Sequence, residues 1–161
     1  MLSDHQVQKK IEILSNKLNL GNYKEVINEV SILIKKNKHQ VLFNILSLAY
    51  QGTGELKKSE TIMDEALKLN PNNPYFLNNM GTTQHKMGNY SRAEEYFTKG
   101  LKIVPNYINI LNNLGNLKRD LDKVDEAIKY YDKSVSLNNN ILITNYTLSS
   151  MYVQKGEYNK A

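Results

Sequence analysis

The sequence has no cysteine and only three histidines among its 161 residues. Without cysteine, the chain can form neither a disulfide framework nor a thiolate metal site or nucleophile. It also lacks a long apolar run, since nothing approaches the roughly 18 residues that would span a membrane. The first residues lack the basic start and apolar stretch of a secretory signal. These absences agree with a reducing compartment, and we predict a cytoplasmic protein.

The residue patterns of a catalytic or metal site are also missing. His5, His39 and His85 are scattered, so none forms the i, i+4 pair or the histidine–carboxylate pattern of a metal site. The segment Gly52-Thr53-Gly54 follows no strand, and we interpret it as a turn between helices rather than a phosphate loop. No nucleophile lies in a pattern with a base and an orienting group. We therefore predict that this segment is not an enzyme and binds no metal or cofactor.

What the sequence does contain is a pattern that returns after 34 residues. The stretch from Pro74 to Leu137 carries nearly the same pattern twice. The coinciding residues are Leu77 with Leu111, Met80 with Leu114, Gly81 with Gly115, Ala93 with Ala127, and Phe97 with Tyr131. Such a fixed period is typical of stacked helical repeats, and about 34 residues is the tetratricopeptide period. The chain resembles the tetratricopeptide repeat in the order of its typed positions, which are Leu77, Met80, Gly81, Ala93, Phe97 and Pro105.

Further copies of the pattern lie upstream and downstream of this stretch. Gly21, Gly54 and Gly156 fall where Gly88 falls in the third copy. We expect four full repeats and a truncated fifth in one array, at about 7–39, 40–73, 74–107, 108–141 and 142–161. The first repeat is divergent, as terminal repeats commonly are. Because Ala161 would open a helix that the sequence does not continue, we expect a fragment of a longer protein.

Each repeat is predicted to form two antiparallel helices, at about 74–87 and 90–103 in the third copy, because its apolar residues keep helical spacing. Gly88 suits the left-handed turn between them. Asp122 takes that place in the fourth repeat, and aspartate tolerates this conformation better than most residues. Small residues such as Gly81 and Gly115 would let the two helices approach closely. The resemblance implies an all-α fold, a right-handed superhelical solenoid of antiparallel helix pairs.

In the tetratricopeptide family, the first helices of the repeats line a concave groove that usually holds an extended peptide. The resemblance implies that polar residues line this groove in the present chain. They are Asn44, Asn78, Asn79, Thr82, His85, Asn112, Asn113, Asn116 and Arg119. Three of the asparagines, Asn44, Asn78 and Asn112, share one repeat position. We therefore expect a row of carboxamides on the inner surface.

A row of carboxamides can recognise peptide main chain, because each one offers two donors and an acceptor. The row resembles the asparagine ladder in the repeat region of O-linked N-acetylglucosamine transferases, including the string NNLGN at 112–116. The alternative is that asparagine is common in this chain and fills solvent-exposed positions. The carboxylate clamp of chaperone-binding relatives is not matched, since its lysine and arginine positions hold threonine, asparagine or isoleucine. Binding of chaperone tails is therefore disfavoured.

The formal charge of +5 raises the question of a nucleic-acid partner. A nucleic-acid reader concentrates positive charge where the phosphate backbone runs. Here most lysines fall on the second helices or in turns, as Lys58 and Lys99 do, and the expected groove carries chiefly Lys86 and Arg119. An RNA-binding helical repeat is accordingly the third choice.

Two hypotheses for function follow from these observations. The first is a protein-interaction scaffold that holds an extended peptide or partner segment in the groove. The second is the substrate-recruiting arm of a larger transferase, glycosyl- or sulfotransferase-like. We also expect self-association through an exposed apolar edge at Leu148, Met151 and Tyr152, since no second helix covers them in the truncated repeat.

Overall fold

The computed structural model describes residues 4–138 and 142–156, and these residues form α-helices joined by short turns. The helices are α1 (Asp4–Asn19), α2 (Tyr23–Lys36), α3 (Gln40–Thr53), α4 (Leu56–Leu69), α5 (Pro74–Lys86), α6 (Tyr90–Ile103), α7 (Ile108–Asp120), α8 (Val124–Leu137) and α9 (Leu142–Lys155). The described residues contain no strand, so the predicted all-α repeat fold is confirmed. None of the described helices is both long and apolar enough to cross a membrane.

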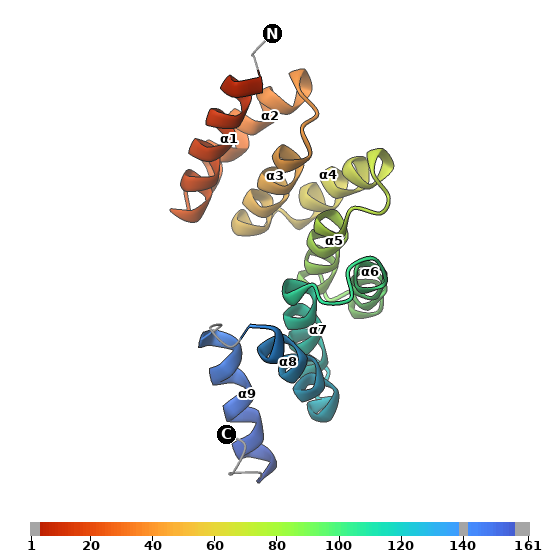
Figure 1. Ribbon diagram of the computed structural model, residues 1–161. Helices are drawn as coiled ribbons and strands as arrows, with labels where there is room; N and C mark the ends of the chain where they lie inside the picture. Colours follow the sequence, from red (N-terminus) through yellow and green to blue (C-terminus); the bar gives the residue numbers. More distant parts are fainter. Residues whose placement is uncertain (1–3, 139–141, 157–161) are drawn as a thin grey trace.

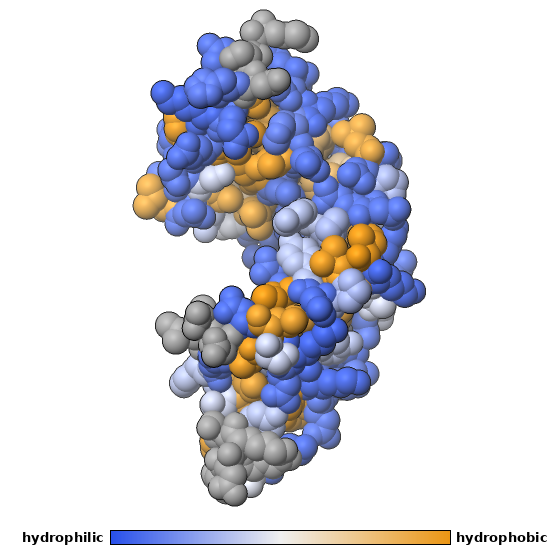
Figure 2. Space-filling model, in the orientation of Figure 1, coloured by the Kyte–Doolittle hydropathy of each residue, from blue (hydrophilic) through white to orange (hydrophobic). Residues whose placement is uncertain are grey.

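The helices stack into a curved array (Figure 1). The odd-numbered helices follow one another along the inner side of the curve, and α4 and α6 lie on the outer side. Figure 2 shows the resulting C-shaped outline, with a hollow on the side that the odd-numbered helices line. Successive odd-numbered helices also touch directly, α3 against α5 and α5 against α7. The residues predicted for the groove therefore lie on helices that meet along one surface.

The turns inside the helix pairs confirm the predicted backbone conformations. Gly88 has a φ of 78° and Asp122 a φ of 57°, both in the left-handed region. Asp122 is the one described residue other than glycine with a positive φ, at a cost of about 1 kcal/mol or more. Helix α5 begins at Pro74, and the Asn73 side chain accepts hydrogen bonds from the backbone N–H groups of Tyr75 and Phe76. These caps satisfy amide groups that the helix itself cannot.

Glycines bring the two helices of a pair into close contact. A Cβ added to Gly81 would lie 2.5 Å from the Phe97 ring, and one added to Gly115 would lie 2.5 Å from the Tyr131 ring. Both rings are buried, with exposures of 0% and 2%. The close approach predicted from these small residues is therefore confirmed, and each aromatic ring occupies the space that a side chain would otherwise fill.

The second pair is built differently, around buried hydroxyl and amide groups. Ser47 lies 2.8 Å from Ser59, and the Ser59 hydroxyl lies 2.9 Å from that of Thr83 on the following pair. The Gln51 amide donates to the Thr83 hydroxyl at 3.0 Å and to the Asn79 carbonyl at 3.2 Å. These side chains are almost fully buried and hydrogen-bonded to one another, so this polar cluster joins α3, α4 and α5 through satisfied polar groups.

The divergent first repeat also forms a helix pair. Leu14 stands where the other repeats have a small residue, and it is completely buried. It packs with Val7 and Ile11 against Val26 and Val30. A leucine at this position supplies apolar contact where the other pairs have a glycine or serine.

The expectation of an exposed apolar edge at α9 is wrong. Leu148, Met151 and Tyr152 are buried, with exposures of 8%, 4% and 7%. They pack on Ala127 and Tyr131 of α8, because the first helix of a repeat rests on the second helix of the repeat before it. The predicted self-association therefore loses the surface on which it depended. The end of the predicted fifth repeat, residues 157–161 with Ala161, lies outside the described residues.

Candidate functional site

Four carboxamides on α3, α5 and α7 form a hydrogen-bonded chain, which we call the amide row. The Asn113 Nδ2 donates to Asn78 Oδ1 at 2.9 Å, and the Asn79 Nδ2 donates to Asn44 Oδ1 at 3.1 Å. A longer contact of 3.5 Å links Asn78 Nδ2 to Asn79 Oδ1 within α5. The row thus crosses three repeats, and its donors between helices are directed from α7 toward α3.

The amide row uses a different spacing from the one that the sequence suggested. Residues that share a repeat position are 34 apart. The bonded pairs, Asn44 with Asn79 and Asn78 with Asn113, are 35 apart. A residue on one inner helix therefore meets the residue one place further along on the next. Asn79 is nearly buried, and Asn113 uses Nδ2 for hydrogen bonds with both Asn78 and Thr82. The groups of the row that remain for a ligand are chiefly Nδ2 of the half-buried Asn44 and Oδ1 of the half-buried Asn113.

Three further residues of the predicted groove differ in their surroundings. Thr82 receives a hydrogen bond of 3.2 Å from Asn113 Nδ2, so it belongs beside the amide row. Asn116 accepts a hydrogen bond of 2.7 Å from the Tyr131 hydroxyl, which fixes a core ring and serves packing. The Oδ1 of Asn112 is buried and has no hydrogen-bond partner among the described residues. Such an orphaned acceptor costs about 1–3 kcal/mol.

His85 and Arg119, at the far ends of α5 and α7, meet at a carboxylate that we did not predict. The His85 Nε2 lies 3.0 Å from Asp120 Oδ2, and Arg119 Nη2 lies 3.2 Å from Asp120 Oδ1. The His85 ring also makes an edge-to-face contact with Tyr90, with centroids 5.7 Å apart. Asp120 stands 35 residues beyond His85, the same offset that joins the amide row, so this offset was the signal that could have revealed it.

Lys118 is a second residue that the sequence analysis missed. Its side chain is 4% exposed, and its Nζ lies 2.7 Å from Glu94 and 2.8 Å from Glu126. Burial lowers the pKa of this ammonium, but the hydrogen bonds with Glu126 and Glu94 outweigh burial, so the pKa lies above its ordinary value. Lys118 thereby connects α6, α7 and α8, and its role is to hold two repeats together.

Replacing Lys118 with methionine tests this connection. We expect the free energy of unfolding to fall by about 1.5 kcal/mol at neutral pH, the lower end of the range for hydrogen bonds to charged groups. The hydrogen bond from Lys118 lowers the pKa of Glu126, so its stabilisation is present above the ordinary carboxyl pKa and is lost as the pH falls through the lowered value. The difference between the two proteins, from urea unfolding, should shrink at pH ~3, below the ordinary glutamate pKa of about 4.3. An undiminished difference there would contradict the assignment.

Other surface features of the described residues lie away from the amide row. One shallow hollow lies over α6, lined by Ser91 and Lys102 among others. Another lies where the turn before α2 faces Thr53. No group of three histidine, aspartate or glutamate side chains within the described residues could hold a metal ion. We therefore take the amide row as the candidate site.

Comparison with models of known protein families identifies the repeat. Two profiles described as tetratricopeptide repeat match the sequence, one over residues 62–95 and the other over residues 40–73 and 108–141. Together these matches span more than half of the chain. No curated protein matches the sequence.

Solved structures with the same fold span most of the chain. PilF of Pseudomonas aeruginosa has a TM-score of 0.82 at 20% identity, covering 95% of this chain and 70% of its own. A thermophilic protein of this repeat type from Thermus thermophilus has a TM-score of 0.81 at 19% identity, covering 89% and 79%. MamA of Desulfovibrio magneticus RS-1 has a TM-score of 0.71 at 19% identity, covering 92% and 84%. At these identities the likeness concerns the fold alone.

Proposed function

Because the chain belongs to the tetratricopeptide-repeat family, we propose that it is a protein-interaction scaffold that holds an extended peptide or partner segment along α3, α5 and α7. The observation that carries this proposal is the amide row. Its carboxamides lie on three consecutive inner helices, and a donor on Asn44 and an acceptor on Asn113 are not used within the row. An extended peptide presents alternating N–H and C=O groups, which such carboxamides can bond on either side. Recognition of this kind depends on the peptide main chain and not on its side chains. Its sequence specificity is therefore broad, and each contact adds only modest affinity.

The orphaned acceptor of Asn112 supports the same proposal. Its Oδ1 is buried without a partner among the described residues, although its equivalents on α3 and α5 each accept a hydrogen bond from the next inner helix. A peptide donor that displaced the side chains covering this atom would satisfy it and remove its cost of about 1–3 kcal/mol. Asn112 on α7, beside the amide row, is therefore the place where a ligand N–H gains most.

The double variant Asn78→Ala with Asn112→Ala tests the groove. Loss of two hydrogen bonds, each worth about 0.5–1.5 kcal/mol, should weaken peptide binding by about tenfold. The probe is a peptide selected against the unmodified protein from a random display library, with its affinity measured by fluorescence anisotropy. The matched control is Asn28→Ala with Asn72→Ala, which removes two exposed carboxamides outside the row. Unchanged affinity in the first variant, with helicity intact by circular dichroism, would refute the groove.

In the second hypothesis, the chain is the substrate-recruiting arm of a larger transferase, and the amide row again binds the ligand. The two hypotheses differ in what the gene is expected to encode after Ala161. A catalytic domain in that reading frame would make the row its substrate guide. Further repeats followed by a stop codon would leave the scaffold function alone. Sequencing the coding frame beyond Ala161 distinguishes the two.

A further inference from the structure

One edge of the stack combines positive charge with exposed apolar side chains. It lies where the second helix of each pair ends, and we call it the basic edge. Its residues are Lys36, Lys68, Leu69, Tyr75, Lys102, Ile103, Val104, Lys133 and Leu137. α2 ends with Lys35 and Lys36, and α4 and α6 each have one lysine in the last turn, whereas Lys133 lies one turn before the end of α8. Lys68 with Leu69 recurs 34 residues later as Lys102 with Ile103. In Figure 2, hydrophobic side chains reach the surface near the end of α4 and over α6, beside hydrophilic ones.

The apolar side chains of this edge are unusually open to solvent. Leu69 is 55% exposed and Tyr75 57%, while Ile103 and Leu137 are each 40% exposed. Single exposed apolar residues are common on any protein. Here they recur at equivalent positions of successive repeats, which turns them into a row along the array. The exposed parts of these side chains are not stabilised by packing within this chain, so they remain available for burial by a partner.

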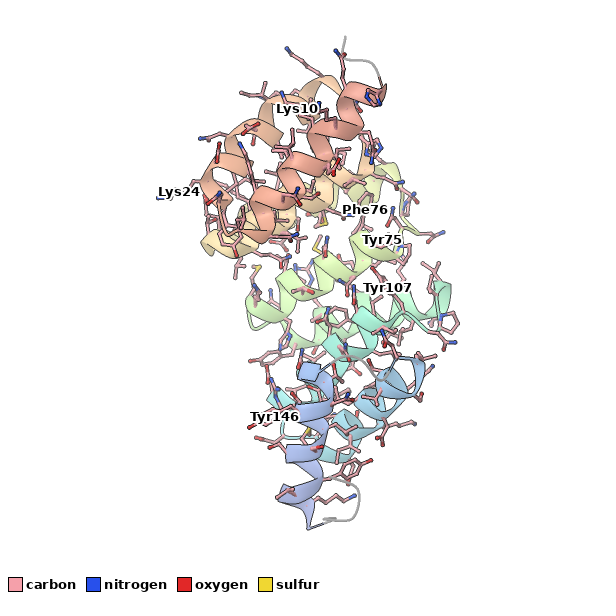
Figure 3. The ribbon with its side chains drawn as sticks, turned by 60° about the vertical axis from the view of Figure 1, so that its left-hand side comes forward. Lys10, Lys24, Tyr75, Phe76, Tyr107 and Tyr146 are labelled. Carbon is pink, nitrogen blue, oxygen red and sulfur yellow. The ribbon has the colours of Figure 1, made fainter. Side chains whose placement is uncertain are left out.

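Contacts across the turns hold the basic edge in a fixed shape. The rings of Tyr75 and Tyr107 meet edge to face with centroids 5.5 Å apart, joining the start of α5 to the turn before α7 (Figure 3). The Lys133 ammonium donates to the Pro105 carbonyl at 3.0 Å, which brings α8 onto the same turn. The turn between α6 and α7 is thus tied to α5 and to α8, so this part of the row is presented by a fixed surface rather than by a free loop.

The lysines of the basic edge carry charge that the rest of the protein does not neutralise. No ion pair joins Lys36, Lys68 or Lys102 to a carboxylate in the described part of the chain. Several other cations are paired: Lys38, just after α2, with Glu65 at 3.4 Å, Arg92 with Glu60 at 3.3 Å, and Lys118 with two glutamates. The helix dipole favours a lysine in a last turn. It does not explain why an exposed aliphatic residue follows the lysine in two successive repeats, as Leu69 follows Lys68 and Ile103 follows Lys102.

We propose that the basic edge binds an acidic segment of another protein that carries apolar side chains, separately from any peptide on the amide row. Unopposed ammonium groups attract carboxylates, and the neighbouring leucine, isoleucine and tyrosine side chains can be buried by an apolar partner. A chain segment can follow the curved edge over several repeats (Figure 1). A flat membrane would reach only a part of that curve, and a nucleic acid would not bury aliphatic side chains.

The test uses four fluorescein-labelled synthetic peptides of equal length, which combine either glutamate or lysine with either leucine or serine. Fluorescence anisotropy is expected to give the tightest binding for the glutamate–leucine peptide. The variant Lys68→Glu with Lys102→Glu should weaken that binding by about tenfold or more. The control Lys24→Glu with Lys129→Glu makes the same change of net charge at exposed lysines outside the basic edge. It should leave the affinity within about threefold of the unmodified protein.

A second variant separates apolar contact from charge. Ile103→Ser with Val104→Ser keeps every lysine and should also weaken binding of the glutamate–leucine peptide, while the glutamate–serine peptide is unaffected. Equal binding of the two glutamate peptides, or equal losses in the edge and control variants, would overturn the proposal. So would tighter binding to phosphatidylserine vesicles or to single-stranded polyuridine than to any peptide. Asn78→Ala with Asn112→Ala should not change this binding, so the two surfaces are tested independently.

Discussion

Replacing Phe97 with alanine is expected to lower the free energy of unfolding by about 3–5 kcal/mol, the usual cost of removing a buried phenylalanine. Phe97 is fully buried and belongs to the core that joins α6 to α7, with Ile110 and Leu114. The site cannot close easily around the cavity, because the facing residue is Gly81, which has no side chain to move into the space. We therefore expect a loss toward the upper end of the range.

Urea unfolding followed by circular dichroism measures this loss. The control is Tyr146→Ala, which removes an aromatic ring that is 80% exposed and should change stability by no more than about 0.5 kcal/mol. A loss below about 1 kcal/mol in Phe97→Ala, a small part of the cost quoted for a buried ring, would mean that this interface contributes little to the array. Because each repeat contacts only its neighbours, the unfolding curve of the variant is also expected to broaden.

The variant Gly81→Val is expected to cost about 3 kcal/mol, the upper end of the range for overpacking. Its Cβ alone would lie 2.5 Å from the Phe97 ring, and a planar ring held in a core cannot retreat as a flexible chain can. The control is Gly100→Ala, whose Cβ would clash only with the terminal methyl group of Ile110, at 2.4 Å. That methyl can rotate away, so we expect a much smaller loss from the same unfolding measurement.

Combining Gly81→Val with Phe97→Leu should recover part of this loss, since the smaller side chain leaves room for the valine. In the second repeat, Ser47 occupies the place of Gly81, and the unbranched Met63 occupies the place of Phe97. The chain thus contains both combinations, a glycine facing an aromatic ring in the third repeat and a serine with a more flexible methionine in the second. Strict additivity of the two single-variant losses would show that the residues do not interact.

The sequence contained most of the fold and only part of the candidate site. A 34-residue period, with glycines at its turns, was enough to predict the helix pairs and even the left-handed Asp122. Those features are local, because they depend on the order of residues within one repeat. The burial of Leu148 and Tyr152 was missed because it depends on how a helix faces the repeat before it.

For the candidate site, contacts between repeats were again the part that could not be predicted. Shared repeat position suggested Asn44, Asn78 and Asn112 as equivalents, whereas the bonds join residues 35 apart. The offset of 35 residues is set by how the inner helix of one repeat is shifted along the inner helix of the next. This shift cannot be predicted from the residues of a single repeat. Asp120 and Lys118 were missed for the same reason, since their partners lie on neighbouring helices. Pairs between repeats are found by comparing offsets, not by reading one repeat.

The buried polar cluster around Ser47, Ser59 and Thr83 has a consequence for the elasticity of the array. Hydrogen bonds are directional, so this joint between α4 and α5 resists changes in the angle between its repeats. The joint between α6 and α7 is also held by directional contacts, because the nearly buried Lys118 ammonium meets Glu94 at 2.7 Å beside the apolar packing of Ile110 with Phe97. Both joints should therefore resist bending under load. The amide row crosses both joints, so the spacing between Asn78 and Asn113 is expected to stay nearly constant when the array is stretched.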